Sequence, residues 1–404
     1  MQGTIDWIQL AAAVGILQGL LLAGVLAAHQ SNRTANRLLA TLMVACTIYL
    51  ASALYYSAGW TRAYPHFFGI SYPLPWVFGP LVYLYAVAAS DRSWHFRRRH
   101  ALHFAPAIVV VIATLPIYLM SGPEKIALYD RLRAGDSPTL LAVLGPSMYV
   151  SGLSYSVATV AHLRQHRRRV ENSYSNTERV NLSWLVRLAG AGAAIWLLAV
   201  SIAIAGVVPR PIRPHGSDLV ALAIALLVYA IGYMGLRQPE IFRYDGPPTS
   251  SRPELVPAEP TPSEAAPAEV VPHPAERGDS RYERSGLGDA EAAKLKAELL
   301  ALMRREHLYR DPDLTLPDLA GRLNTTPHKL SEVLNTELAQ TFYDFVNGHR
   351  VDDVRRRLVE PGSKRVSLLA LAMDAGFASK STFNQVFKKQ TGQTPSTYRK
   401  ALAG

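Results

Sequence analysis

The sequence of 404 residues is almost free of cysteine and poor in the residue patterns that carry catalysis. Cys46 is the single cysteine, so an intrachain disulfide is excluded, and its apolar surroundings predict a small core residue. The chain has no HExxH motif, no carboxylate pair within an apolar block and no Ser/His pair at a catalytic spacing. We therefore expect no enzyme, no cofactor and no metal site, and nothing indicates an ion-coupled transporter.

Charge is also scarce, at 18% of residues, and it is unevenly placed. The first apolar block has Asp6 ahead of it and lacks a basic stretch, so a cleavable signal peptide is not expected. The net charge is nevertheless +11, which favours anionic partners such as nucleic acid or anionic lipid.

Long apolar runs fill residues 1–244. Seven blocks approach the roughly 20 apolar residues that cross a bilayer, and they lie at 5–28, 37–58, 66–89, 101–120, 140–163, 182–207 and 218–236. The third block is the least regular, because Pro73, Pro75 and Pro80 can kink it or make it re-entrant. We therefore predict an N-terminal bundle of about seven transmembrane helices that serves as a sensor or anchor.

Lys and Arg in the short loops predict the orientation of this bundle. The loops after the first, third and fifth blocks carry eleven of these residues, whereas the alternate loops carry six. The more basic loops are expected on the cytoplasmic side. The prediction is a multi-pass protein of the bacterial inner (cytoplasmic) membrane, with its N-terminus outside and residues 237–404 in the cytoplasm.

Two groups of residues in this half each allow two interpretations. The pairs His100/His103 and His162/His166 have spacings that could ligate a metal, but neighbouring Arg clusters disfavour a cation and favour interfacial histidines. Aromatic residues gather near the expected outer ends of the spans, at Trp60, Tyr64, Phe67, Phe68, Tyr72 and Trp76. They are typical of an aromatic belt at the headgroup level, or they form the wall of a ligand pocket that opens outward.

Residues 245–285 have a different composition. Nine are proline, most of the apolar ones are Ala and Val, and acidic residues outnumber basic ones. Such a segment cannot bury a core and is predicted to be a disordered linker. Its random-coil span would be about 35 Å, and it would transmit a rigid mechanical signal poorly.

Residues 286–404 have ordinary globular composition and begin with a helix expected at 289–307, with Asp289 as its N-cap. Two short helices follow, which Thr315 with Asp318 and Thr326 with Pro327 are predicted to start. The second of these has an apolar face and an opposite polar face. This pattern is typical of a helix-turn-helix motif whose second helix enters the major groove.

A long helix is predicted at 341–358, and a second helix-turn-helix pattern follows it. Ser367 starts the first helix of the copy, Gly376 makes the turn, and Ser379 caps a helix expected at 380–390. Its apolar face consists of Phe383, Val386 and Phe387. Amide and Lys side chains on the other face are suited to adenine and guanine edges. The predicted fold class is therefore all-α, with transmembrane helices, a linker and a tandem helix-turn-helix domain.

Two such motifs joined by a long helix resemble the DNA-binding domain of the AraC-type (arabinose-regulator) transcription factors over residues 289–402. The matching residues are Leu319, Ala320, Leu323, Leu330, Ser331, Val333, Ala375, Gly376, Phe377, Ser379, Phe383, Phe387, Lys388, Lys389, Gly392, Pro395, Tyr398 and Arg399. The chain departs from that family at Ala339, where Gly is usual, and at Val354, where Ala is usual. The apolar half resembles, more loosely, the seven-helix modules found ahead of such domains in bacterial membrane-bound regulators.

The resemblance implies that two recognition helices enter successive major grooves. It assigns base contacts to His328, Ser331 and Glu332 in the first helix and to Lys380, Ser381, Asn384 and Gln385 in the second. Phosphate contacts are expected from Lys329, Lys388, Lys389 and Arg399.

These observations predict a membrane-bound, one-component transcription regulator. Its expected partners are double-stranded promoter DNA, the lipid bilayer, an unidentified small-molecule or envelope signal, a second copy of the chain and RNA polymerase. Release of the DNA-binding domain by proteolysis in the linker is a variant of this function. The rivals are a transporter or membrane enzyme with a protein-binding tail, and a tail that only tethers DNA without sequence preference.

Overall fold

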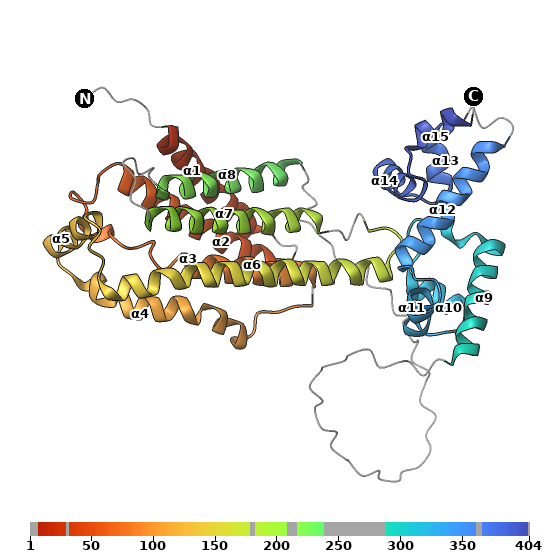
Figure 1. Ribbon diagram of the computed structural model, residues 1–404, viewed down its shortest axis with the longest axis horizontal. Helices are drawn as coiled ribbons and strands as arrows, with labels where there is room; N and C mark the ends of the chain where they lie inside the picture. The colour runs from red at the N-terminus through yellow and green to blue at the C-terminus, as the bar shows by residue number, and fades with distance from the viewer. Residues whose placement is uncertain are drawn as a thin grey trace, which may run out of the picture. The chain divides into compact units, whose positions relative to one another are not determined.

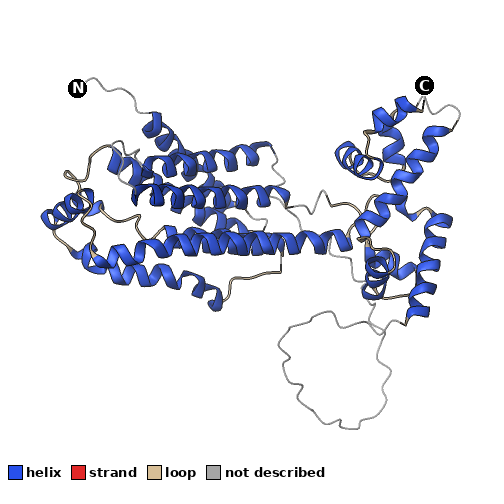
Figure 2. Ribbon diagram, viewed as in Figure 1, coloured by secondary structure: helices blue, strands red, loops and turns tan. Residues whose placement is uncertain are grey.

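The computed structural model describes residues 7–29, 32–91, 93–177, 182–207, 216–237, 288–360 and 366–402. Figure 2 shows helices and loops but no strand among these residues, which confirms the all-α prediction. Contacts divide the chain into two compact units: unit one consists of residues 1–168 and 179–246, and unit two of residues 169–178 and 247–404. The predicted linker, 245–285, lies outside the described residues.

Unit one is a bundle of apolar helices that run alongside one another (Figure 1). Its elements are α1 (Trp7–Ala28), α2 (Arg33–Ser57), η1 (Pro65–Phe67), α3 (Pro75–Ser90), η2 (Arg98–Phe104), α4 (Ala105–Leu119), α5 (Gly122–Arg133), α6 (Thr139–Ser173), α7 (Ser183–Val207) and α8 (Gly216–Arg237). Helix α2 packs against α1, α3 and α8, and Leu39, Met43 and Leu50 on α2 are fully buried in the shared core.

Five segments of unit one are long and apolar enough to cross a membrane. They are Gln9–Ala28, Arg33–Ser57, Arg98–Leu119, Thr139–Ser173 and Trp184–Ala205, and the shorter apolar helices are Pro75–Ser90 and Leu219–Ile231. Large apolar side chains also face outward. On α6, for example, Val143, Val150 and Val157 are spaced by seven residues and are each about 70% exposed. Outward apolar stripes of this kind suit contact with lipid tails rather than water.

Three parts of unit one differ from the predicted blocks. Helix α3 begins at Pro75 rather than at residue 66, because the first helical position tolerates the missing N–H of proline, and turns occupy most of the preceding stretch. Helix α6 continues ten residues beyond the predicted end of the fifth block, to Ser173. Helix α5 was predicted as loop, and a capping box of Ser121 and Glu124 starts it.

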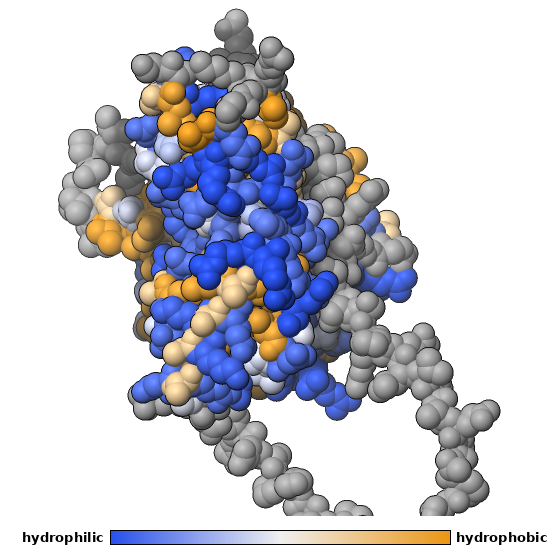
Figure 3. Space-filling model, turned by 90° about the vertical axis from the view of Figure 1, so that its right-hand side faces the viewer, coloured by the Kyte–Doolittle hydropathy of each residue, from blue (hydrophilic) through white to orange (hydrophobic). Residues whose placement is uncertain are grey.

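Unit two contains the helices of the C-terminal domain. They are α9 (Asp289–Glu306), η4 (Leu308–Arg310), α10 (Leu316–Arg322), α11 (Pro327–Thr336), α12 (Phe342–Val359), α13 (Leu368–Asp374), α14 (Lys380–Thr391) and α15 (Pro395–Ala401). The face of this unit that Figure 3 presents is mostly hydrophilic, with scattered hydrophobic patches. Such a surface suits a domain surrounded by water.

Hydroxyl caps begin every α-helix of this unit after α9. The side chains of Thr315, Thr326, Thr341, Ser367, Ser379 and Thr394 each accept a hydrogen bond from the backbone N–H three residues later. Each cap satisfies a donor that would otherwise lack a partner at the start of a helix. The predicted cap at Asp289 is wrong by one residue: Gly288 occupies the cap position and Asp289 lies in the first turn, where its charge still favours the helix dipole.

Helix α12 joins two separate cores. Its first half, including Phe342, Phe345 and Val346, packs with α9, α10 and α11, and its second half, including Val351 and Val354, packs with α13 and α14. Each pair of short helices, α10/α11 and α13/α14, thus has its own apolar support on a shared rigid helix. This arrangement fixes how α11 and α14 are presented.

Candidate nucleic-acid interface

Helix α11 presents a polar face opposite its buried one. Leu330, Val333 and Leu334 are fully or almost fully buried, whereas His328 is exposed and Ser331 and Glu332 are half-buried. Asn335, one turn after Ser331, donates a hydrogen bond of 2.8 Å from Nδ2 to the Ser331 carbonyl oxygen. The three side chains predicted to contact bases therefore share one face of α11.

Helix α14 repeats this arrangement more completely. Phe383, Val386 and Phe387 are buried, and the Phe387 ring lies 5.5 Å from Phe383 and 5.4 Å from Tyr398. The four side chains predicted to contact bases are all exposed, namely Lys380, Ser381, Asn384 and Gln385. Their spacing along the helix places them on the face opposite the aromatic core. Two amides and an ammonium on one exposed face are suited to hydrogen bonding with base edges.

The side chains predicted to contact phosphates differ in how they are held. Lys329 forms an ion pair with Glu291 on α9 at 2.8 Å, and Lys389 forms one with Asp344 on α12 at 2.7 Å. Arg399 donates to the Val366 carbonyl oxygen at 2.6 Å. Lys388 is exposed in the last turn of α14. Exposed ion pairs contribute little to stability, so Lys329 and Lys389 can exchange their partners for phosphate.

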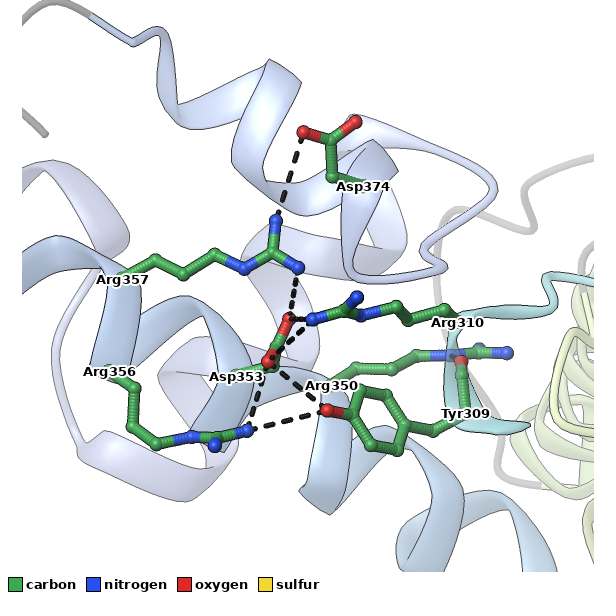
Figure 4. Close-up of polar contacts among 7 residues, drawn as sticks. All are labelled: Tyr309, Arg310, Arg350, Asp353, Arg356, Arg357 and Asp374. Carbon is green, nitrogen blue, oxygen red and sulfur yellow. Dashed lines mark hydrogen bonds and ion pairs between the residues drawn. The ribbon is translucent and has the colours of Figure 1, made fainter. Parts of the chain in front are cut away.

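A buried carboxylate, which the sequence did not single out, holds the end of α12. Asp353 is 3% exposed, and its carboxylate accepts from Tyr309 Oη at 3.1 Å, Arg356 Nη2 at 2.9 Å and Arg357 Nη2 at 2.8 Å, with Arg310 Nη2 at 3.4 Å (Figure 4). Burial raises the pKa of Tyr309, and the nearby Asp353 carboxylate raises it further. The basic residues in the last turn of α12, Arg356 and Arg357, are thus directed in part at an internal anion.

The Arg357 guanidinium also reaches across to α13. Its Nη1 lies 3.8 Å from the Asp374 carboxylate, at the end of that helix. Gly376 then makes the turn into α14 with φ of 96°, and an added Cβ there would collide with the Tyr309 carbonyl oxygen. The turn of the second helix pair is therefore packed directly on the Tyr309 segment of the first.

In unit one, the residues singled out from the sequence do not form a single site. Trp60, Tyr64 and Phe67 line a surface hollow, whereas Phe68 and Trp76 are buried in the bundle. His103 Nδ1 lies 2.9 Å from the Tyr155 hydroxyl, and His100 accepts from the Arg97 N–H. Among the described residues, no group of three or more His, Cys, Asp or Glu side chains is placed to hold a metal.

A second cavity, of about 270 Å³, lies between the helices of unit one. It is mostly apolar, and Tyr49, Tyr149 and Tyr155 supply part of its wall. Apolar cavities with a few polar groups are typical of small-molecule sites.

The matches to known proteins fall in the C-terminal domain of this chain. A family model described as "Helix-turn-helix domain" matches residues 319–401, from α10 to α15. Regulatory protein SoxS of Escherichia coli (strain K12) is 30% identical over 97 residues, which are 24% of this chain and 86% of that protein. The SoxS proteins of Escherichia coli O6:H1 and O157:H7 match equally. No solved structure matches significantly.

The matched region contains both helix pairs, the connecting helix α12 and the capped helices that support them. Its similarity to SoxS extends over most of that regulator's length. Through this domain the chain belongs to the AraC-type helix-turn-helix proteins and is a DNA-binding transcription regulator.

Proposed function

We propose that this chain is a membrane-bound regulator that reads promoter DNA with two recognition helices, α11 and α14, under the control of a signal received by unit one. In this proposal α10/α11 and α13/α14 are both helix-turn-helix motifs. Specificity comes from His328, Ser331 and Glu332 on α11, and from the exposed face of α14. Affinity comes mainly from Lys and Arg on phosphates.

The observation that supports this proposal most directly is the repeated architecture of unit two. Each candidate recognition helix begins at a hydroxyl cap, Thr326 or Ser379, and buries its apolar face in its own core. Each turns polar side chains outward, and α12 fixes both cores. A rigid pair of such helices is what reading of two successive major grooves requires.

The apolar helices of unit one support the membrane part of the proposal. Five candidate spans and two shorter apolar helices fit a seven-helix module. The excess of Lys and Arg between alternate apolar blocks favours a cytoplasmic side for the basic end of α6, Arg164 to Arg169, and for the C-terminal domain. The bacterial inner membrane is then the location, and the cavity of about 270 Å³ is the proposed place for the signal molecule.

A binding selection tests the DNA-reading part. The detergent-solubilised full chain would be incubated with random duplex DNA at two salt concentrations, and the bound fraction would be sequenced. We expect enrichment of a site with two blocks about one helical turn apart, which persists at the higher salt. Binding without enrichment that vanishes steeply as salt rises would instead indicate only phosphate attraction.

The transporter or membrane-enzyme rival makes a different prediction. It requires that solute flux or turnover persist when residues 245–404 are deleted. A chain that enriches a DNA site and has no measurable flux would remove that rival.

A further inference from the structure

Unit two contains a short segment that is remote in sequence from the rest of it. Residues 169–178 follow the membrane-unit part of α6 and belong to unit two with the C-terminal domain. Tyr174 forms an antiparallel bridge with Thr315, the residue that caps α10. The next residue, Ser175, is 1% exposed. An exposed loop would not bury a serine so fully without specific partners.

Every polar atom of Ser175 is used in this contact. Its backbone N–H and its hydroxyl both donate to the Leu314 carbonyl oxygen, at 3.3 and 2.7 Å. Its carbonyl oxygen accepts from Asn347 Nδ2 at 3.1 Å and from Arg350 Nη1 at 3.4 Å. Its hydroxyl oxygen also accepts from Arg350 Nη2 at 3.2 Å. The site thus fits a serine, because the hydroxyl must donate and accept at once.

Arg350 on α12 shows that the site is built for this occupant. The residue is 1% exposed, and its guanidinium has five N–H donors. Three of them reach the carbonyl oxygens of Tyr309 and Asp311 and the Asn347 side chain, at 2.7, 2.7 and 3.0 Å. The other two reach Ser175. Without Ser175, two donors of a buried cation would lose their partners, which is costly.

The charge of Arg350 persists in this setting. Burial lowers the pKa of its guanidinium to about 10, so the side chain stays protonated at neutral pH. The charges of Asp311 and Asp313 attract the guanidinium and partly oppose this lowering of its pKa. Arg350 nevertheless forms no ion pair within the described residues. The five hydrogen bonds of this cation therefore go to neutral carbonyl and hydroxyl oxygens. Ser175 supplies two of these five oxygens.

The site lies where the two halves of the C-terminal domain meet. The Arg350 guanidinium is 5.9 Å from the centre of the Phe377 ring, which belongs to the second core. It also binds the Tyr309–Asp311 strip of the first half, against which Gly376 packs. The residues predicted to contact DNA on α11 and α14 take no part in the contact. Binding of Ser175 in the site therefore uses none of the polar side chains predicted to read DNA.

We propose that residues Tyr174–Asn176, at the end of α6, are a docking segment that binds the slot formed by Leu314, Asn347 and Arg350 between the two halves of the DNA-binding domain. This inference rests on the proposed function, because it names the contact through which unit one regulates the two recognition helices. Helix α6 is continuous up to Ser173, so a displacement of α6 reaches the slot directly. The signal then bypasses residues 245–285.

A disulfide cross-link tests the contact in the full chain. In a Cys46→Ala background, Tyr174→Cys and Thr315→Cys place two thiols at a bridge pair, where Cβ atoms are about 4.5–5.5 Å apart and a disulfide needs only a small adjustment. An engineered protease site within residues 245–285 then separates the chain into two fragments. We expect the two fragments of each cleaved monomer to stay covalently joined until a reductant breaks the disulfide. The control pair, Tyr174→Cys with Lys294→Cys on exposed α9, should not join.

Separate fragments, or joined fragments found only as covalent dimers, would overturn docking within one chain. Since loss of the Thr315 hydroxyl cap could weaken α10, hydrogen exchange of the Ser175→Ala variant provides a second measurement. We expect roughly tenfold faster exchange of the amides of Tyr309–Leu314, from the loss of the hydroxyl-mediated bonds. Ser173→Ala, at the last residue of α6, is the matched control and should leave exchange unchanged. Equal exchange in wild type and Ser175→Ala would also overturn the proposal.

The DNA selection described above separates this inference from the proposed function. An enriched two-block site without a cross-link and without faster exchange removes the docking segment and leaves sequence-specific DNA reading intact. A cross-link without any enriched site removes DNA reading, and the slot is then a contact of some other kind of tail.

Discussion

Ala339 lies in a backbone conformation that suits glycine. Its φ is 51°, in the turn between α11 and α12, and it stands where glycine is usual in the resembling family. The left-handed region costs an L-residue about 1–2 kcal/mol in the folded state. Glycine avoids this cost, but its greater backbone freedom favours the unfolded chain by about 0.4–1 kcal/mol. We therefore expect Ala339→Gly to stabilise unit two by about 0.5–1 kcal/mol, measured as the urea midpoint of the full chain in pulse proteolysis.

Ala378 is the matched control for that substitution. It is an exposed loop alanine before α14 and has no positive φ, so Ala378→Gly brings only the entropic cost and should destabilise by about 0.4–1 kcal/mol. A shift of the same sign in both variants would contradict the backbone argument.

Gln385 is the residue of α14 for which base reading can be tested most cleanly. Its amide is exposed on the polar face, and a bidentate amide–adenine pair contributes about 1–3 kcal/mol of discrimination. We expect Gln385→Ala to lose preference at one position of the selected site. Gln390, exposed at the end of the same helix with its side chain near Gly348 of α12, is the control, and Gln390→Ala should leave the preference unchanged.

His349 predicts a pH dependence for unit two. Its ring stacks on Tyr309 and meets Phe345 edge-on, and burial lowers its pKa below the ordinary 6.5, with Arg356 and Arg304 acting in the same sense and Asp352 opposing. Below pH 6.5 the unfolded chain binds a proton that the folded unit excludes, so stability falls as pH falls. Wild type should lose more of its urea midpoint between pH 7.5 and 5 than His349→Phe. Equal losses would show that other groups are responsible.

At the scale of elements, helix starts in unit two were predictable and their tertiary partners were not. Thr315, Thr326, Ser367 and Ser379 cap helices where the sequence indicated, because a hydroxyl three residues ahead of its N–H partner is a local signal. The basic run 355–357 lies at the end of α12, where the helix dipole favours positive charge. Its anion, however, is Asp353 within the same helix, and Tyr309, 44 residues away, shares it. No local pattern reports such a distant contact.

In unit one, the apolar runs predicted most helices but not their boundaries. Hydropathy does not distinguish the turns before Pro75 from α3, because both are apolar. It also missed α5, which is polar and depends on its capping box. The contact between Arg350 and Ser175 could not be predicted from the sequence either, because the two residues are 175 positions apart.

The Asp353 cluster makes a prediction about α12. Asp353→Asn removes the charge that holds Arg356, Arg357 and the Tyr309 hydroxyl together. We expect the free energy of unfolding, measured by pulse proteolysis, to fall by about 1–3 kcal/mol. The ion pair with Arg357 is shielded from water and accounts for most of this loss, whereas Arg356 and Arg310 can be solvated instead. Asp352→Asn lies beside it, but the Asp352 side chain is 64% exposed and its ion pair with Arg355 is at the surface, so this change should alter stability by less than about 0.5 kcal/mol.

At the scale of the whole molecule, two connections from unit one to the DNA-binding domain are proposed, the docking segment and residues 245–285, and they can be tested separately. Lengthening residues 245–285 with a Gly/Ser insert should cost only a few tenths of a kcal/mol in loop closure. We therefore expect the insert to leave both the 174–315 cross-link and the affinity for the selected site unchanged. A marked fall in either would show that the length of this segment, rather than the docked loop, positions the domain.

Unit two is discontinuous in sequence, and this has a consequence for biosynthesis. Ser175 leaves the ribosome 175 residues before Arg350, which at 5–20 residues per second is roughly 10–35 s. In the proposed membrane topology, helices α7 and α8 are made and inserted during that interval. The docking segment can meet its slot only if both end on the same side of the bilayer. Under the proposed docking and topology, closure of the slot would report correct membrane insertion, because a chain inserted in mixed orientation would leave the two Arg350 donors to Ser175 without partners.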